Sequence, residues 1–144
     1  MTIRRFAGAA LVALGMGMAA QADDLPPPGD AEAGKALFAR YCTACHGEDA
    51  DGDGPMRPVL VIGPTDLRRL AVENDGVFPL RRVIWRIDGR DPVLSHGSMM
   101  PVYGEVFGAG PPETLRAATG QPIMTTEPMA DLVAYLRGLQ VRQP

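Results

Sequence analysis

Cys42-Thr43-Ala44-Cys45-His46 is the stretch of sequence that decides the fold. Its C-x-x-C-H spacing is typical of a covalent c-type haem attachment site, because two thiols about one helical turn apart can reach two vinyl groups of one porphyrin. The histidine directly after the second cysteine can bring its imidazole to the iron. The spacing therefore predicts one covalent haem c held by Cys42 and Cys45, with His46 as an iron ligand.

Other uses of this motif fit the sequence less well. The chain has two cysteines, and both lie in the motif. A zinc site needs two more ligands at comparable spacing, and there is no second cysteine pair. A thioredoxin-like redox pair follows a strand in a βαβ pattern, and no such pattern precedes Cys42. A structural disulfide is the plainest alternative, but an export signal and a downstream Met-Pro favour haem.

The beginning of the chain has the pattern of an export signal. Arg4 and Arg5 form a positive region, the uncharged run from Phe6 to Ala20 follows, and Ala20-Gln21-Ala22 matches an A-x-A cleavage site. The run is shorter than the ~20 residues that a membrane-spanning helix needs. We therefore expect residues 1–22 to be a signal peptide cleaved after Ala22, and the mature protein to lie in the periplasm without a membrane span.

The composition of the remaining 122 residues suits a single small domain. Loss of Arg4 and Arg5 changes the formal net charge from −3 to −5, which argues against nucleic acid and anionic membranes as partners. The chain has one Trp, three Tyr and four Phe, so its own core would be thin. A buried porphyrin would fill that core.

The remaining pattern is helical, after a Pro-rich lead-in over residues 23–29. Apolar residues at helical spacing predict three helices, over 31–41 with Asp30 as N-cap, from Pro79 to a stop at Gly89, and over 127–139. Two shorter helices are predicted over 65–73 and 113–119, with irregular chain over 47–64 and 90–112. We find no convincing strand pattern.

Several of these stretches together resemble a class I c-type cytochrome. They are Gly34 and Phe38 in the first helix, Cys42-x-x-Cys45-His46-Gly47, Met100-Pro101, and Tyr135 and Leu136 in the last helix. The sequences at 64–67, 74–79 and 96–98 are similar to one bacterial branch of that family. The resemblance covers nearly all of the mature chain.

This resemblance implies an all-α fold, with a cytochrome c domain over residues 30–144 wrapped around one haem. The first and last helices should cross, so that Gly34 and Phe38 meet Tyr135. In the family a proline carbonyl accepts a hydrogen bond from the second ring nitrogen of the haem-binding histidine. For His46, both Pro58 and Pro64 are candidates, and spacing does not choose between them.

Met100 is the predicted second iron ligand. Pro101 restricts the residue before it to an extended conformation, which favours a side chain at Met100 held in one direction. Met99 should then point the opposite way. His96 is a rival, but it would give a lower-potential site with two imidazoles, and His46 with Met100 suits electron transfer better.

An acidic turn resembles the first half of a calcium loop. Asp49, Asp51 and Asp53 have the right spacing, but Leu60 stands where such a loop carries a bidentate Glu. We therefore expect a solvated turn that does not bind calcium tightly.

Six arginines form a basic run in an otherwise acidic chain: Arg68, Arg69, Arg81, Arg82, Arg86 and Arg90. A solvated helix face is the favoured interpretation. The functional alternative is that one arginine binds a haem propionate while others contact a partner. Trp85 and Tyr103 are further propionate candidates.

These features predict an exported mono-haem cytochrome that carries single electrons between larger redox proteins, such as a dehydrogenase, a reductase or a terminal oxidase. We expect a monomer and no enzymatic site of its own, because no nucleophile or general base is apparent. One alternative is a permanent subunit of an oxidoreductase complex. Another is a haem sensor with an open sixth position.

Overall fold

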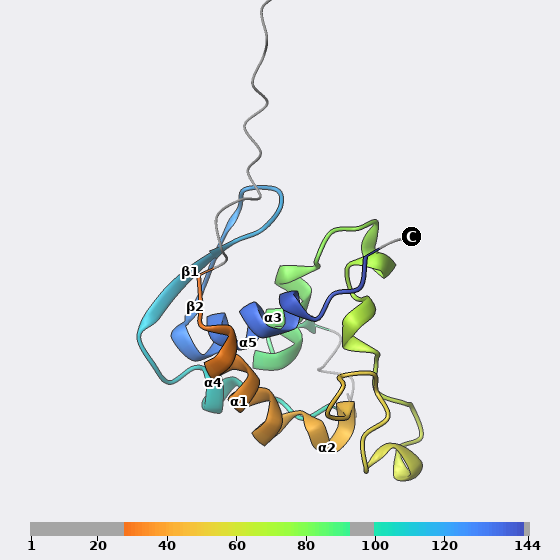
Figure 1. Cartoon of the computed structure of the whole chain (residues 1–144). Coiled ribbons are helices and arrows are strands. Elements are labelled where there is room, and N and C mark those ends of the chain that lie inside the picture. Colours follow the sequence, from red (N-terminus) through yellow and green to blue (C-terminus); the bar gives the residue numbers. More distant parts are fainter. Residues whose placement is uncertain (1–27, 93–99, 143–144) are drawn as a thin grey trace, which may run out of the picture.

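The computed structural model describes residues 28–92 and 100–142 of the chain (Figure 1). The predicted signal peptide, Met99 and His96 lie outside the described residues. In chain order the elements are α1 (Ala31–Tyr41), α2 (Thr43–His46), the 3-10 turns η1 (Arg57–Val59), η2 (Leu67–Arg69) and η3 (Val72–Asn74), α3 (Leu80–Asp88), α4 (Gly104–Phe107), β1 (Pro112–Arg116), β2 (Pro122–Thr126) and α5 (Glu127–Gly138).

Helices α1 and α5 cross closely, as predicted. Asp30 caps α1 by accepting hydrogen bonds from the backbone of its first turn, and its own N–H donates to the buried Asp131 side chain at 2.7 Å. Gly34 permits the crossing, because a Cβ at this position would overlap the Asp131 carbonyl. The rings of Phe38 and Tyr135 lie 5.3 Å apart, which confirms their predicted contact.

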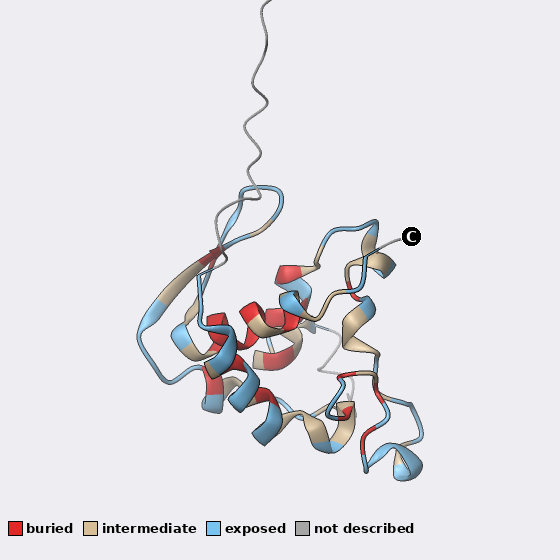
Figure 2. Ribbon diagram, viewed as in Figure 1, coloured by how far each residue is buried: buried red, intermediate tan, exposed pale blue. Residues whose placement is uncertain are grey.

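The other two long helices also match their sequence patterns. The buried residues of α3 are Leu80, Val83, Ile84 and Ile87, which is the predicted apolar stripe. Gly89 ends α3 in the left-handed region at φ 89°. Helix α5 buries Met129, Leu132, Val133 and Leu136, and Figure 2 shows its buried face at the centre of the molecule.

The predicted short helix over 113–119 is wrong. This region forms an antiparallel hairpin of β1 and β2, so the described part of the chain is mainly helical but not all-α. Each strand buries one residue, Leu115 and Ile123, and these two pair across the hairpin. The turn between the strands has Gly120 at φ 82°, which favours glycine. Gly120 and Pro122, which follow the wrongly predicted helix, instead form the turn and start β2.

The predicted short helix over 65–73 is also wrong, because it is replaced by two separate 3-10 turns. Asp66 begins η2 by accepting a hydrogen bond from the Arg68 backbone, and η3 ends at Asp75, whose φ is 55°. The break leaves Leu67 and Leu70 free to turn towards the interior, where Leu70 is buried.

Among the described residues, no helix is long and apolar enough to cross a bilayer.

Candidate haem site

One cavity brings the predicted ligands together. Its volume is about 610 Å³, within the range of roughly 300–1,000 Å³ typical of small-molecule and cofactor sites. Cys42, Cys45 and His46 line it from the end of α1 and from α2, and Met100 lines it from the segment before α4. Helices α3 and α5 contribute aliphatic side chains to its wall, such as those of Val83 and Leu132. A largely apolar site with two thiols, an imidazole and a thioether fits a covalently attached haem.

The motif is held by a single turn of helix. Cys42 is both the C-cap of α1 and the N-cap of α2, and its carbonyl accepts a hydrogen bond from the backbone N–H of His46 at 2.8 Å. This turn brings both thiols to the wall of the cavity, and the Cys42 and Cys45 side chains are not joined in a disulfide. Burial raises the pKa of the Cys42 thiol to about 12, and the neighbouring Cys45 adds to the increase.

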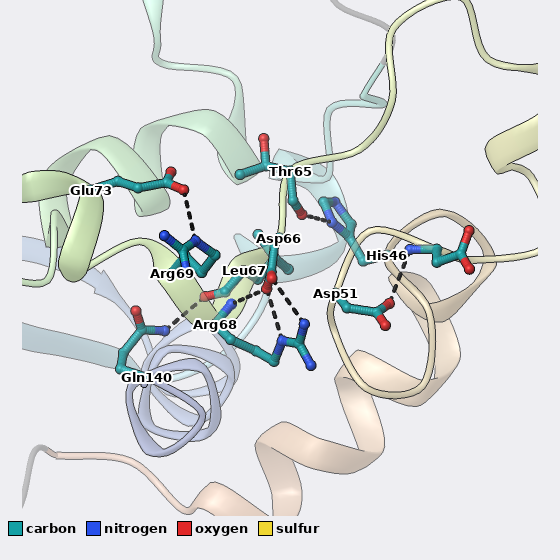
Figure 3. A network of polar contacts seen from close by, with 10 residues as sticks. His46, Asp51, Thr65, Asp66, Leu67, Arg68, Arg69, Glu73 and Gln140 are labelled. Carbon is teal, nitrogen blue, oxygen red and sulfur yellow. Dashed lines mark hydrogen bonds and ion pairs between the residues drawn. The ribbon is translucent and has the colours of Figure 1, made fainter. Parts of the chain in front are cut away.

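His46 is oriented by the Thr65 carbonyl. Its Nδ1 lies 3.1 Å from that oxygen, as the dashed line in Figure 3 shows. A carbonyl can only accept a hydrogen bond, so Nδ1 carries the proton and Nε2 keeps its lone pair. Burial lowers the pKa of His46, while the bond to Thr65 acts in the opposite direction. The imidazole therefore has one nitrogen available to bind a metal.

The expectation that a proline carbonyl fills this role is wrong for both Pro58 and Pro64. The Pro64 carbonyl instead packs against Gly52, where a Cβ would overlap it. Gly52 has φ 89° and donates its N–H to the His46 carbonyl at 2.9 Å. The acceptor, Thr65, directly follows Pro64, whose own carbonyl lies against the loop that follows the haem motif.

Met100 reaches the same cavity from a segment that is anchored on both α1 and α3. Tyr103, which also lines the cavity, donates its N–H to the Ile87 carbonyl at 2.7 Å and its hydroxyl to the Tyr41 carbonyl at 3.0 Å. Its ring packs edge-on against Tyr41 and Phe107. These contacts fix the chain three residues after Met100 and close to the start of the haem motif.

The basic run is largely neutralised by acidic neighbours. Four of its arginines form ion pairs: Arg68 with Asp66, Arg69 with Glu73, Arg86 with Asp91, and Arg90 with Asp88. Arg81 stacks on Trp85. Arg82 and Arg86 line the cavity, so these two are the candidates for binding haem propionates. The Tyr103 hydroxyl donates to the Tyr41 carbonyl instead, and Trp85 packs against the core.

The acidic turn uses its carboxylates locally. Asp51 accepts a hydrogen bond from the Asp53 backbone at 3.0 Å (Figure 3). No group of three or more acidic, His or Cys side chains within 28–92 and 100–142 is arranged to hold a metal ion. The absence of tight calcium binding stays a prediction.

Comparison with known proteins identifies the family. A family model described as "Cytochrome c" matches residues 31–140. The chain belongs to the cytochrome c family. No curated protein and no solved structure gives a significant match. Membership of the cytochrome c family implies haem-based electron transfer, and it agrees with the class I resemblance and with the helical fold described above.

Proposed function

We propose that this member of the cytochrome c family is an exported carrier of single electrons with one covalent haem, attached at Cys42 and Cys45 and ligated by His46 and Met100. The observation that carries the proposal is the placement of all four side chains around one cavity of about 610 Å³. A haem in this cavity supplies a one-electron iron couple. The chain supplies the attachment points, the ligands and the apolar walls.

The proposed ligands match that role in their chemistry. The Nδ1–H of His46 donates to the Thr65 carbonyl, which fixes the orientation of the ring and leaves Nε2 for iron. The Met100 thioether is soft and uncharged, so it favours the reduced metal more than a second imidazole would. The His46 N–H is hydrogen-bonded to the Cys42 carbonyl, and the chain three residues after Met100 is anchored through Tyr103, which limits the movement of both ligands when the charge of the site changes.

The proposed location and partners rest on the sequence. Covalent haem is added outside the cytoplasm, and residues 1–22 have the pattern of a cleaved signal. The proposal is a periplasmic monomer that exchanges electrons with larger redox proteins. Purification tests the alternative of a permanent subunit, because a subunit would remain bound to its partner.

The experiment that tests attachment is haem staining of denaturing gels after expression with the signal and with haem-attachment machinery. We expect staining of the unmutated protein at the size of the chain without residues 1–22, and none for the double variant Cys42→Ala/Cys45→Ala. Thr43→Ala is a matched control within the same turn and should still stain. Covalent staining of the double variant would contradict the proposal.

A further inference from the structure

Gln140 follows α5 and connects the end of this helix to the segment that carries the Thr65 carbonyl. Its side chain makes three hydrogen bonds, which use both ends of the amide. Nε2 donates to the Leu67 carbonyl at 2.8 Å and to the Leu136 carbonyl at 2.7 Å, and Oε1 accepts the Ala71 N–H at 2.9 Å. A single side chain therefore bridges α5 and both ends of the stretch from Leu67 to Ala71.

The backbone of Leu67 connects Gln140 to the loop that follows the haem motif. Its N–H donates to the Ala50 carbonyl at 2.8 Å, in the loop after His46, and its carbonyl accepts from Gln140. Thr65, whose carbonyl accepts the His46 Nδ1–H, precedes Leu67 by two residues (Figure 3). The backbone of Leu67, two residues after the His46 acceptor, is thus held from one side by the motif loop and from the other by Gln140.

Gln140 does not line the cavity itself, unlike Leu67 and Leu136, which it contacts. The backbone adds one parallel link, from the Val141 N–H to the Arg68 carbonyl at 2.9 Å. Two of these three links between the end of α5 and residues 67–71 therefore depend on the Gln140 amide. Gln140 can act on the iron through the Thr65–His46 hydrogen bond, and exchange of the Nδ1 proton separates this route from a change in the cavity wall at Leu67 or Leu136.

We propose that Gln140 is a positioning residue for the proximal iron ligand: by holding the Leu67 peptide, it sets the strength of the hydrogen bond from His46 Nδ1 to the Thr65 carbonyl. This inference rests on the proposed function, because it concerns a haem bound through His46. A stronger bond makes the imidazole a more basic ligand and stabilises ferric iron, which lowers the reduction potential. Weakening the bond raises the potential.

The experiment compares the unmutated holoprotein with Gln140→Met and Gln140→Glu. Methionine is neutral and of similar length but makes none of the three hydrogen bonds. Glutamate keeps an oxygen for the Ala71 N–H but has no N–H for the Leu67 carbonyl. We expect the Nδ1 proton of His46, followed by nuclear magnetic resonance in the ferrous state, to exchange faster with deuterium in both variants. We also expect a higher potential in Gln140→Met.

The matched control is Thr126→Val, which removes a side-chain hydrogen bond to the Phe107 carbonyl at the other end of α5. It should lower the melting temperature without changing the proton exchange or the potential. If Gln140→Met lowers only the melting temperature, or Gln140→Glu exchanges like the unmutated protein, the inference is wrong. Lack of haem in the unmutated protein would contradict the proposed function as well, so the two failures are distinguishable.

Discussion

Replacement of Gly34 by alanine tests the helix crossing on which the haem site is built. The added Cβ would lie 2.5 Å from the Asp131 carbonyl carbon and 3.0 Å from the Leu132 nitrogen, against 3.4–4 Å for ordinary contact. These are backbone atoms of α5, so no side chain can rotate to relieve the overlap. The two helices must therefore separate, which disturbs the packing of Phe38 on Tyr135.

The expected cost follows from two opposing effects. Overpacking of a core costs about 1–3 kcal/mol, and the upper end applies here because backbone must move. Alanine returns about 1 kcal/mol through its higher helix propensity. The net loss is about 2 kcal/mol, which corresponds to about 8 °C in melting temperature for a domain of this size.

Thermal unfolding of the holoprotein, followed by far-ultraviolet circular dichroism, measures this loss. Gly138→Ala is the control, because a Cβ added to this residue of α5 would meet no atom within 4 Å. It should melt at or slightly above the temperature of the unmutated protein. Equal melting of Gly34→Ala and Gly138→Ala would refute the close crossing.

Two further predictions concern the distal segment and the acidic turn. Tyr103→Phe removes the hydrogen bond from the Tyr103 hydroxyl to the Tyr41 carbonyl and should lower the free energy of unfolding by about 1 kcal/mol while covalent haem is retained. Tyr135→Phe is the comparison, because the Tyr135 hydroxyl makes none of the hydrogen bonds identified within 28–92 and 100–142. Equal melting temperatures of the two variants would argue against the Tyr103–Tyr41 bond. Calorimetric titration with micromolar calcium should show no saturable site at Asp49, Asp51 and Asp53, because Leu60 cannot supply the missing carboxylate. A one-to-one site would overturn that prediction.

The sequence predicts well the elements whose information lies in side-chain periodicity. The stripe from Leu80 to Ile87 repeats at helical spacing and ends at a glycine, so α3 could be placed to within a residue. The crossing of α1 and α5 follows from Gly34 and Phe38 once the family resemblance is recognised. The haem motif is recognised from its C-x-x-C-H spacing, and its three side chains line one cavity; covalent attachment at this motif stays a prediction.

The hairpin could not be predicted from alternation. Each strand has five residues and buries only one of them, so there is no run of alternating apolar side chains. The remaining signal is the β-branched content of β2 and the turn glycine Gly120, and both are also compatible with irregular chain. The pairing of Leu115 with Ile123 supplies stability that becomes visible only in three dimensions.

The partner of His46 escapes prediction for a different reason. The acceptor of its Nδ1–H is a backbone carbonyl, a group that every residue has, so the Thr65 side chain gives no sign of this role. Gln140 escapes prediction as well, because it lies 73 residues from the Leu67 carbonyl that it contacts. Sequence spacing alone cannot bring such distant groups together.

The proposed function depends most on the identity of the second iron ligand. Met100 lines the same cavity as the haem motif, and Met99 and His96 are the rival ligands nearby in the sequence. Ferric haem with a thioether ligand has a weak red charge-transfer band from sulfur to iron. The band therefore reports directly whether a methionine binds.

The most direct measurement is the red absorption of the ferric protein in Met100→Ala and its controls. We predict that Met100→Ala loses the band and has a lower reduction potential, while Met99→Ala and His96→Ala keep the band. Met124→Ala, an exposed methionine on the hairpin, should keep it too. Survival of the band in Met100→Ala, or its absence from the unmutated protein, would contradict ligation by His46 and Met100.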